Sequence, residues 1–175
     1  PSLPVRRDNY HPDFDALEAA VTGRTKAIML NSPNNPTGAV YTPEEIKQLL
    51  DFAKKHDLWI LDDMIYATLA WTDYPYTSPS SLPGGAERTI TIGGWSKGWA
   101  MTGWRLGWIT GPKRVMDGVK KINVSAATHV ATFMMPAATV ALGLHEETAM
   151  MAASFKERRG IIHELLTELP GVVVP

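Results

Sequence analysis

The sequence predicts an α/β fold, a three-layer sandwich with a mostly parallel sheet. Two observations predict it. Short apolar runs alternate along the chain with helical patterns, which favours parallel strands joined by helices. Turn-forming or polar residues follow or finish these runs, and such sheets bind ligands beyond the carboxyl ends of their strands. A functional site is therefore expected at that edge of the sheet.

The first third of the chain supplies two helices and one strand. Residues 14–21 place apolar side chains at helical spacing, and residues 25–31 (TKAIMLN) then form a short run typical of a buried strand. A second helix is expected to begin after Thr42. Threonine at the N-cap, Pro43 at the first helical position and Glu45 as the third residue form a capping box.

Three further strands are predicted over residues 58–63 (LWILDD), 88–94 (RTITIGG) and 105–111 (RLGWITG). The longest apolar run, residues 130–144, is shorter than the roughly 20 residues of a membrane span. Pro136 also interrupts it. We expect this run to be a buried helix and the protein to have no membrane segment.

Composition narrows the class of function. The 175 residues are 45% hydrophobic and 20% charged, so the chain can bury one sizeable core. A net charge of −1 without a long basic run argues against a nucleic-acid partner. The absence of cysteine excludes disulfides, thiolate nucleophiles and sulfur-bound metals, and the five histidines lack the paired spacing of a metal site.

Three stretches at predicted strand ends carry the polar residues of interest: NSPNNPTG (31–38), DDMIY (62–66) and WSKGWAMTGWRLGWITGP (95–112). Taken singly, their members have ordinary explanations. The tetrapeptide Asn-Pro-Thr-Gly at 35–38 is common turn chemistry. Asp63 can cap a helix that follows a strand, Lys97 can be a surface lysine, and Arg105 can be an ion-pair partner.

Together and in this order, the three stretches resemble the class I and II aminotransferases, which are fold-type I pyridoxal-phosphate (PLP) enzymes. They resemble the family's Asn-Pro-x-x-Pro-Thr-Gly turn, its Asp-x-x-Tyr strand end and its lysine-to-arginine segment. The resemblance implies transfer of an amino group between an amino acid and a 2-oxo acid through PLP. It also implies a cytoplasmic homodimer.

By this resemblance, Lys97 holds PLP as a Schiff base and later acts as general acid and base. A lysine suits both roles once a partly desolvated setting lowers the pKa of its amine. Trp95 and Trp99 could supply that desolvation or could equally be packing residues. Asp63 would face the pyridine nitrogen and keep it protonated. The neighbouring Asp62 stands where the family usually has a small residue.

The remaining cofactor contacts are implied in the same way. Tyr66 and Asn35 would donate hydrogen bonds to the phenolic oxygen of the ring, and Arg105 would clamp the phosphate with its two-pronged guanidinium. Ser96 is expected to add a hydroxyl donor or to be a turn serine. Gly94 stands three residues before the lysine, where many family members have a phosphate-binding serine, so the phosphate would depend on other groups.

The resemblance also implies a domain division. Residues 1–145 would form part of the PLP-binding large domain, residues 146–170 an interdomain helix and residues 171–175 the start of a truncated small domain. We therefore expect these residues to be inactive alone. Two alternatives stay open: a PLP-dependent lyase of the same fold, and the aminotransferase-like sensor domain of a transcription regulator. The sequence does not identify the substrate amino acid.

Overall fold

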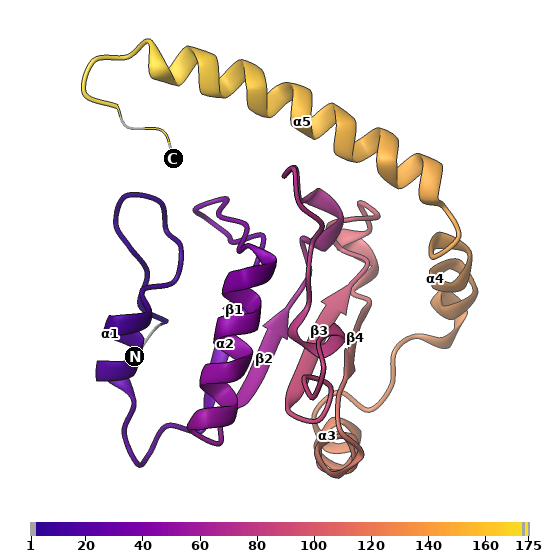
Figure 1. Ribbon diagram of the computed structural model, residues 1–175. Helices are drawn as coiled ribbons and strands as arrows, with labels where there is room; N and C mark the ends of the chain where they lie inside the picture. The colour runs from indigo at the N-terminus through magenta and orange to yellow at the C-terminus, as the bar shows by residue number, and fades with distance from the viewer. Residues whose placement is uncertain (1–2, 173, 175) are drawn as a thin grey trace.

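The computed structural model describes residues 3–172 and residue 174. Its sheet has four strands in the order β1 (Ala27–Asn31), β2 (Trp59–Asp63), β3 (Thr89–Gly94) and β4 (Gly107–Thr110). The first three strands run parallel and β4 runs antiparallel to β3 (Figure 1). The prediction of an α/β fold with a mostly parallel sheet is confirmed.

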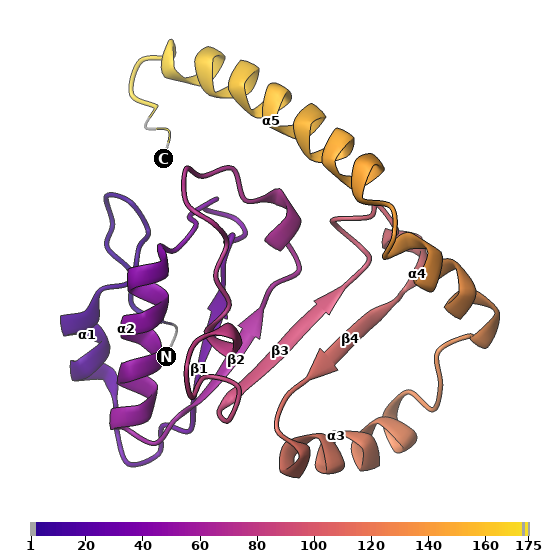
Figure 2. The same cartoon turned by 45° about the vertical axis from the view of Figure 1, so that its right-hand side comes forward.

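Two helices, α1 (Phe14–Ala20) and α2 (Pro43–Lys55), cover one face of this sheet (Figure 2). The start of α2 is fixed by the predicted capping box, in which the Thr42 hydroxyl accepts from the Glu45 amide at 3.2 Å. Glu45 in turn accepts from the Thr42 amide at 2.9 Å. Both exchanges satisfy amide groups that a helix start leaves without partners.

The hydrophobic core lies between these helices and the sheet. Its buried members come from α1, β1, β2, α2 and the segments beside them: Leu17, Ile28, Leu30, Tyr41, Ile46, Leu49, Leu50, Phe52, Ala53, Leu58 and Ile60. On the other face of β1, Met29 is 59% exposed. Within residues 3–172 the sandwich is thus built mainly on one side of the sheet, as expected for an incomplete share of the fold.

Three more helices surround the sheet. The long α5 (His145–Thr167) crosses above the carboxyl ends of β1 to β3 in both views (Figures 1 and 2). Its bounds are close to the range 146–170 in which a helix was predicted. The sequence analysis missed α3 (Lys113–Ala126), which begins where the guanidinium of Arg114 lies 4.5 Å from the ring centre of Trp59. None of the described helices is both long and apolar enough to cross a membrane.

The expectation of a buried helix over residues 130–144 is confirmed only in that a short helix forms there; its burial is wrong. This run forms a short 3-10 turn (Thr132–Met134) and then α4 (Met135–Ala141). Only Ala138 and Ala141 are buried, whereas Phe133 is 81% exposed. The physical reason is that the described residues touch only one side of α4, through the β3–β4 loop.

Candidate functional site

The turn after β1 is built so that Asn35 projects from it. The side chain of Asn34 braces the turn by accepting a hydrogen bond from the Thr37 hydroxyl at 2.8 Å. Gly38 closes it with its amide on the Asn34 carbonyl at 2.8 Å and with a φ of 77°, which glycine adopts without strain. Asn35 is left exposed, and its amide donates to the Tyr66 hydroxyl at 3.0 Å.

Asn31, which the sequence analysis overlooked, connects this turn to β2. Its side-chain oxygen accepts a hydrogen bond from the backbone N–H of Asn35 at 2.9 Å. Its side-chain nitrogen donates to the backbone carbonyl of Asp63 at 3.2 Å. Asn31 and Asp63 also face each other in the strand register. The Asn31 side chain therefore helps to fix the distance between Asn35 and Asp63, which are both predicted to contact the cofactor. The available signal was a polar residue ending an apolar strand.

Asp63 ends β2 and shapes the chain that follows it. One carboxylate oxygen accepts from the Ile65 amide at 3.2 Å, which bends the backbone directly after the strand. The bend brings Tyr66 to the start of the 3-10 turn η1 (Ala67–Leu69), where α5 makes its contact with the sheet domain. Tyr66 is half-buried, with its hydroxyl directed at Asn35.

Lys97 lies in the loop after β3 and is exposed. Its amine is 5.7 Å from the centre of the Tyr66 ring. Three loops, which follow three parallel strands, thus bring Asn35, Tyr66 and Lys97 together at the carboxyl edge of the sheet. This is the edge at which a site was expected.

Trp95 and Trp99 make the packing contacts that were one of the two roles considered for them. Their indole N–H groups donate to the carbonyls of Ala138, at 3.1 Å, and Ala141, at 2.6 Å. They therefore hold α4 against the Lys97 loop and act as packing residues, while Lys97 itself stays exposed in this structure.

The glycines beside Lys97 are there because neighbouring groups approach closely. A Cβ on Gly98 would lie 2.4 Å from the hydroxyl of Thr68. A Cβ on Gly94 would lie 2.8 Å from the Leu106 carbonyl oxygen and 3.2 Å from the Gly107 Cα. A serine at position 94 would thus collide with the backbone of Leu106 and Gly107 unless β4 shifted.

The loop also carries the other two predicted contacts. Arg105 has a φ of 53° and donates to the Thr102 carbonyl at 2.9 Å, so its guanidinium faces its own turn. Ser96 is half-buried in the turn that contains Lys97. Among the described residues, neither has a hydrogen bond to Asn35, Tyr66 or Lys97.

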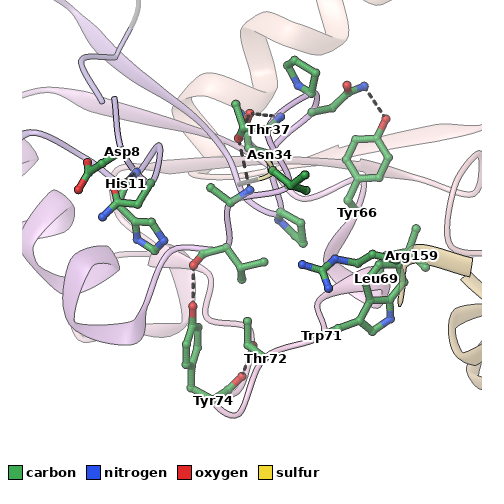
Figure 3. A pocket seen from close by; sticks show the side chains of 18 residues that line it. Asp8, His11, Asn34, Thr37, Tyr66, Leu69, Trp71, Thr72, Tyr74 and Arg159 are labelled. Atoms are coloured by element: carbon green, nitrogen blue, oxygen red, sulfur yellow. Dashed lines mark hydrogen bonds between the residues drawn. The ribbon is translucent and has the colours of Figure 1, made fainter. Parts of the chain in front are cut away.

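A cavity of about 810 Å³ opens beside the Asn35 turn. Tyr66, Trp71 and Tyr74 are among the residues that line it, and Figure 3 shows Arg159 of α5 beside Trp71. The Tyr74 hydroxyl donates to the Val40 carbonyl at 2.7 Å, which ties the loop after β2 to the turn after β1. One acid, Asp8, and one cation, Arg159, line the cavity. Of the predicted site residues, Asn35 and Tyr66 line it, whereas the lining does not include Asp63, Ser96, Lys97 and Arg105.

The residues at the carboxyl edge of the sheet fit PLP by their chemistry. Lys97 supplies an amine, and Tyr66 lies beside it. Tyr66 accepts its hydrogen bond from Asn35, so its own hydroxyl hydrogen is free to donate to the phenolic oxygen of the ring. Asp63, at the end of β2, supplies a carboxylate, the group that would keep a pyridine nitrogen protonated. Arg105 would have to leave the Thr102 carbonyl to reach a phosphate.

Comparison with known proteins finds similarity to aminotransferases over nearly the whole chain. Residues 3–175 match the family described as "Aminotransferase class I and II". An aspartate aminotransferase of Musicola paradisiaca is 37% identical over 172 residues, which are 97% of this chain and 43% of that protein. An aromatic-amino-acid aminotransferase of Thermococcus litoralis is 38% identical over 95% of this chain and 44% of its own length.

Solved structures agree. The crystal structure of an aromatic aminotransferase from Pyrococcus horikoshii superposes with a TM-score of 0.91 at 36% identity, over 95% of this chain and 46% of that one. An N-succinyldiaminopimelate aminotransferase from Mycobacterium tuberculosis gives 0.89 at 33% identity. The chain spans less than half the length of these relatives.

Proposed function

Because this chain belongs to the class I and II aminotransferases, a family of PLP-dependent transferases, we propose that the protein containing it is an aminotransferase. It would move an amino group between an amino acid and a 2-oxo acid. The observation that carries the proposal is the approach of the Lys97 amine to Tyr66, whose hydroxyl is held by Asn35. These three residues come from loops that follow three different strands.

PLP, when bound, supplies the electron sink that lets an amino group leave one carbon and join another. Asp63 would hold a proton on the ring nitrogen, because a carboxylate beside a pyridinium favours the charged form. Tyr66 and Asn35 would donate to the phenolic oxygen and stabilise its anion. Asn31 keeps both contacts in register, since it bonds to the backbone of Asn35 and of Asp63.

Lys97 has two tasks in this proposal. Its amine would hold the cofactor covalently until a substrate amine takes its place. The freed amine would then remove the proton from the substrate Cα and deliver it to the cofactor. Positioned proton transfer of this kind contributes about 10²–10⁴-fold to a rate.

The phosphate would be held by Arg105, with Ser96 as a second donor. A guanidinium matches two phosphate oxygens at once. Since Gly94 leaves no room for a hydroxyl at its position, further contacts have to come from other parts of the protein.

A second subunit is part of the proposal. The surface of α3, α4, α5 and the 3-10 turn before α4 carries large apolar side chains that the described residues leave exposed: Ile122, Val124, Phe133, Met135, Val140, Met150, Phe155, Ile161, Ile162 and Leu165. Exposed apolar area on this scale marks an interaction surface. A homodimer and the remaining length of the protein would cover it.

The experiment is amino transfer by the full-length protein that contains these residues. An isotopically labelled amino group on a donor amino acid should appear on the amino acid formed from a 2-oxo acid. Lys97→Ala should lower the transfer rate by about 10²–10⁴-fold or more. Lys113→Ala should not, because Lys113 is an exposed lysine paired only with Asp117 on the surface of α3.

Two outcomes would contradict the proposal. Transfer that survives Lys97→Ala would remove the lysine from the reaction. Release of ammonia or sulfide from the donor, without a labelled product amino acid, would identify a PLP-dependent lyase instead.

A further inference from the structure

Asp62 is the only Asp, Glu, Lys, Arg or His side chain that is buried within residues 3–172, with 2% of its surface exposed. It lies on the covered face of β2, between Leu30 of β1 and Thr91 of β3 in the strand register. It forms no ion pair with a described cation. A buried carboxylate without a cation is costly, so the fold must stabilise it in another way.

The partner of Asp62 is a chain of hydroxyl groups. Ser78 donates to the Asp62 carboxylate at 2.5 Å, and the hydroxyls of Ser78 and Ser80 are 2.9 Å apart. Ser78 begins a 3-10 turn (Pro79–Ser81) that packs against β3. The bond therefore ties the loop after β2 to the interior of the sheet, beneath the candidate site.

Asp63 is the next residue on the same strand and points to the opposite face. The strand ends here, so the two carboxyl groups share one edge of the sheet. Tyr76, from the same loop as Ser78, has a buried hydroxyl with no hydrogen-bond partner among the described residues. Its pKa is raised by burial and then by the charges of Asp62 and Asp63, which places one phenol near both carboxyl groups.

No other charge faces Asp62. β1 and β3 present Leu30 and Thr91, and the loop presents Ser78 and the phenol of Tyr76. The side chains that α2 buries in this layer are apolar: Ile46, Leu49, Leu50, Phe52 and Ala53. The charge of Asp62 is therefore poorly screened, and its charged or titratable neighbours are the carboxyl group of Asp63 and the phenol of Tyr76.

We propose that Asp62 is a positioning residue of the cofactor site. Its buried negative charge, which the Ser78 hydroxyl stabilises, would lie next to Asp63 and increase the attraction of this edge of the sheet for the protonated ring nitrogen. This inference rests on the proposed function, because it takes Asp63 as the partner of that nitrogen. Two adjacent carboxylates repel each other, and a bound pyridinium relieves the repulsion, so the cofactor gains affinity from both charges.

The ionisation of Asp62 provides the signature. Burial raises its pKa to about 6, opposed by the Ser78 hydrogen bond and reinforced by the charge of Asp63. Asp62 is thus uncharged well below pH 6 and negatively charged well above it. A purely structural role for Asp62 would affect cofactor binding equally at every pH.

The test is PLP binding to the full-length apoprotein across this pH range, for the wild type and Asp62→Asn. The dissociation constant of Asp62→Asn divided by that of the wild type should be near one at about pH 5. It should rise to about ten at about pH 8, because the wild type then binds PLP more tightly. Asp73→Asn removes an exposed acid from the same loop and is the charge-matched control, for which the ratio should stay near one throughout. A ratio for Asp62→Asn that does not change with pH would overturn the inference.

Ser78→Ala is the second variant and keeps the carboxyl group in place. Losing the hydrogen bond that favours the ionised form should move the rise in affinity to higher pH, and an unmoved rise would overturn the inference even if Asp62→Asn does not fold. No amino donor is needed for these measurements. A protein that binds PLP in this way without transferring an amino group would contradict the proposed function and support the role of Asp62.

Discussion

Gly94 offers the sharpest structural prediction, because its substitution affects both the sheet and the Lys97 loop. Gly94 ends β3 opposite Gly107 of β4. A Cβ at Gly94 would lie 2.8 Å from the Leu106 carbonyl oxygen and 3.2 Å from the Gly107 Cα. Both are backbone atoms, so no side-chain rotation relieves the contact. Gly94→Ala should therefore push β4 away from β3 and cost about 1–3 kcal/mol of stability.

The matched control is Gly103→Ala, where a Cβ would meet nothing within 4 Å. Both substitutions reduce the conformational entropy of the unfolded chain to a similar degree, so their difference isolates the collision. Urea unfolding of the full-length protein should show Gly94→Ala less stable than Gly103→Ala by about 1–3 kcal/mol. PLP affinity should fall in Gly94→Ala alone, because Lys97 is three residues away. Equal stability of the two variants would refute the reasoning.

Two further predictions concern α4 and Asp62. Trp99→Phe removes the 2.6 Å bond to the Ala141 carbonyl, which should cost about 1 kcal/mol and speed amide exchange in α4; unchanged exchange there would contradict the anchoring role. For Asp62, whose pKa rises from 3.8 unfolded to about 6 folded, ionisation opposes folding. The unfolding free energy of the wild type relative to Asp62→Asn should therefore fall by about 2 kcal/mol from about pH 4 to above pH 7. A constant difference across that range would show that Asp62 does not titrate as described.

Local patterns were enough to predict the sheet and the start of α2. The strand runs were bounded by turn residues, and the capping box at Thr42 is a short-range device that the structure reproduces. The pattern of residues 113–126 was not singled out, although α3 forms there. Apolar composition predicted burial of residues 130–144, but composition does not say whether a covering surface lies within the same chain.

The site was predictable only in part, for a similar reason. The three motif stretches named Asn35, Tyr66 and Lys97, and the structure brings these together. The contacts that hold them in place span long distances in sequence. Asn31 of β1 reaches Asp63 of the neighbouring strand β2, and Trp99 reaches Ala141 at the end of α4. No local pattern encodes such pairings, because they depend on the folded arrangement of the strands.

The most direct test of the central claim is to find where the cofactor attaches. The full-length protein should be incubated with PLP, reduced with borohydride, digested and analysed by peptide mass. The site described here predicts that the reduced pyridoxyl group is found on Lys97. Attachment at another lysine, such as Lys113 or Lys120, with Lys97 unmodified, would contradict it.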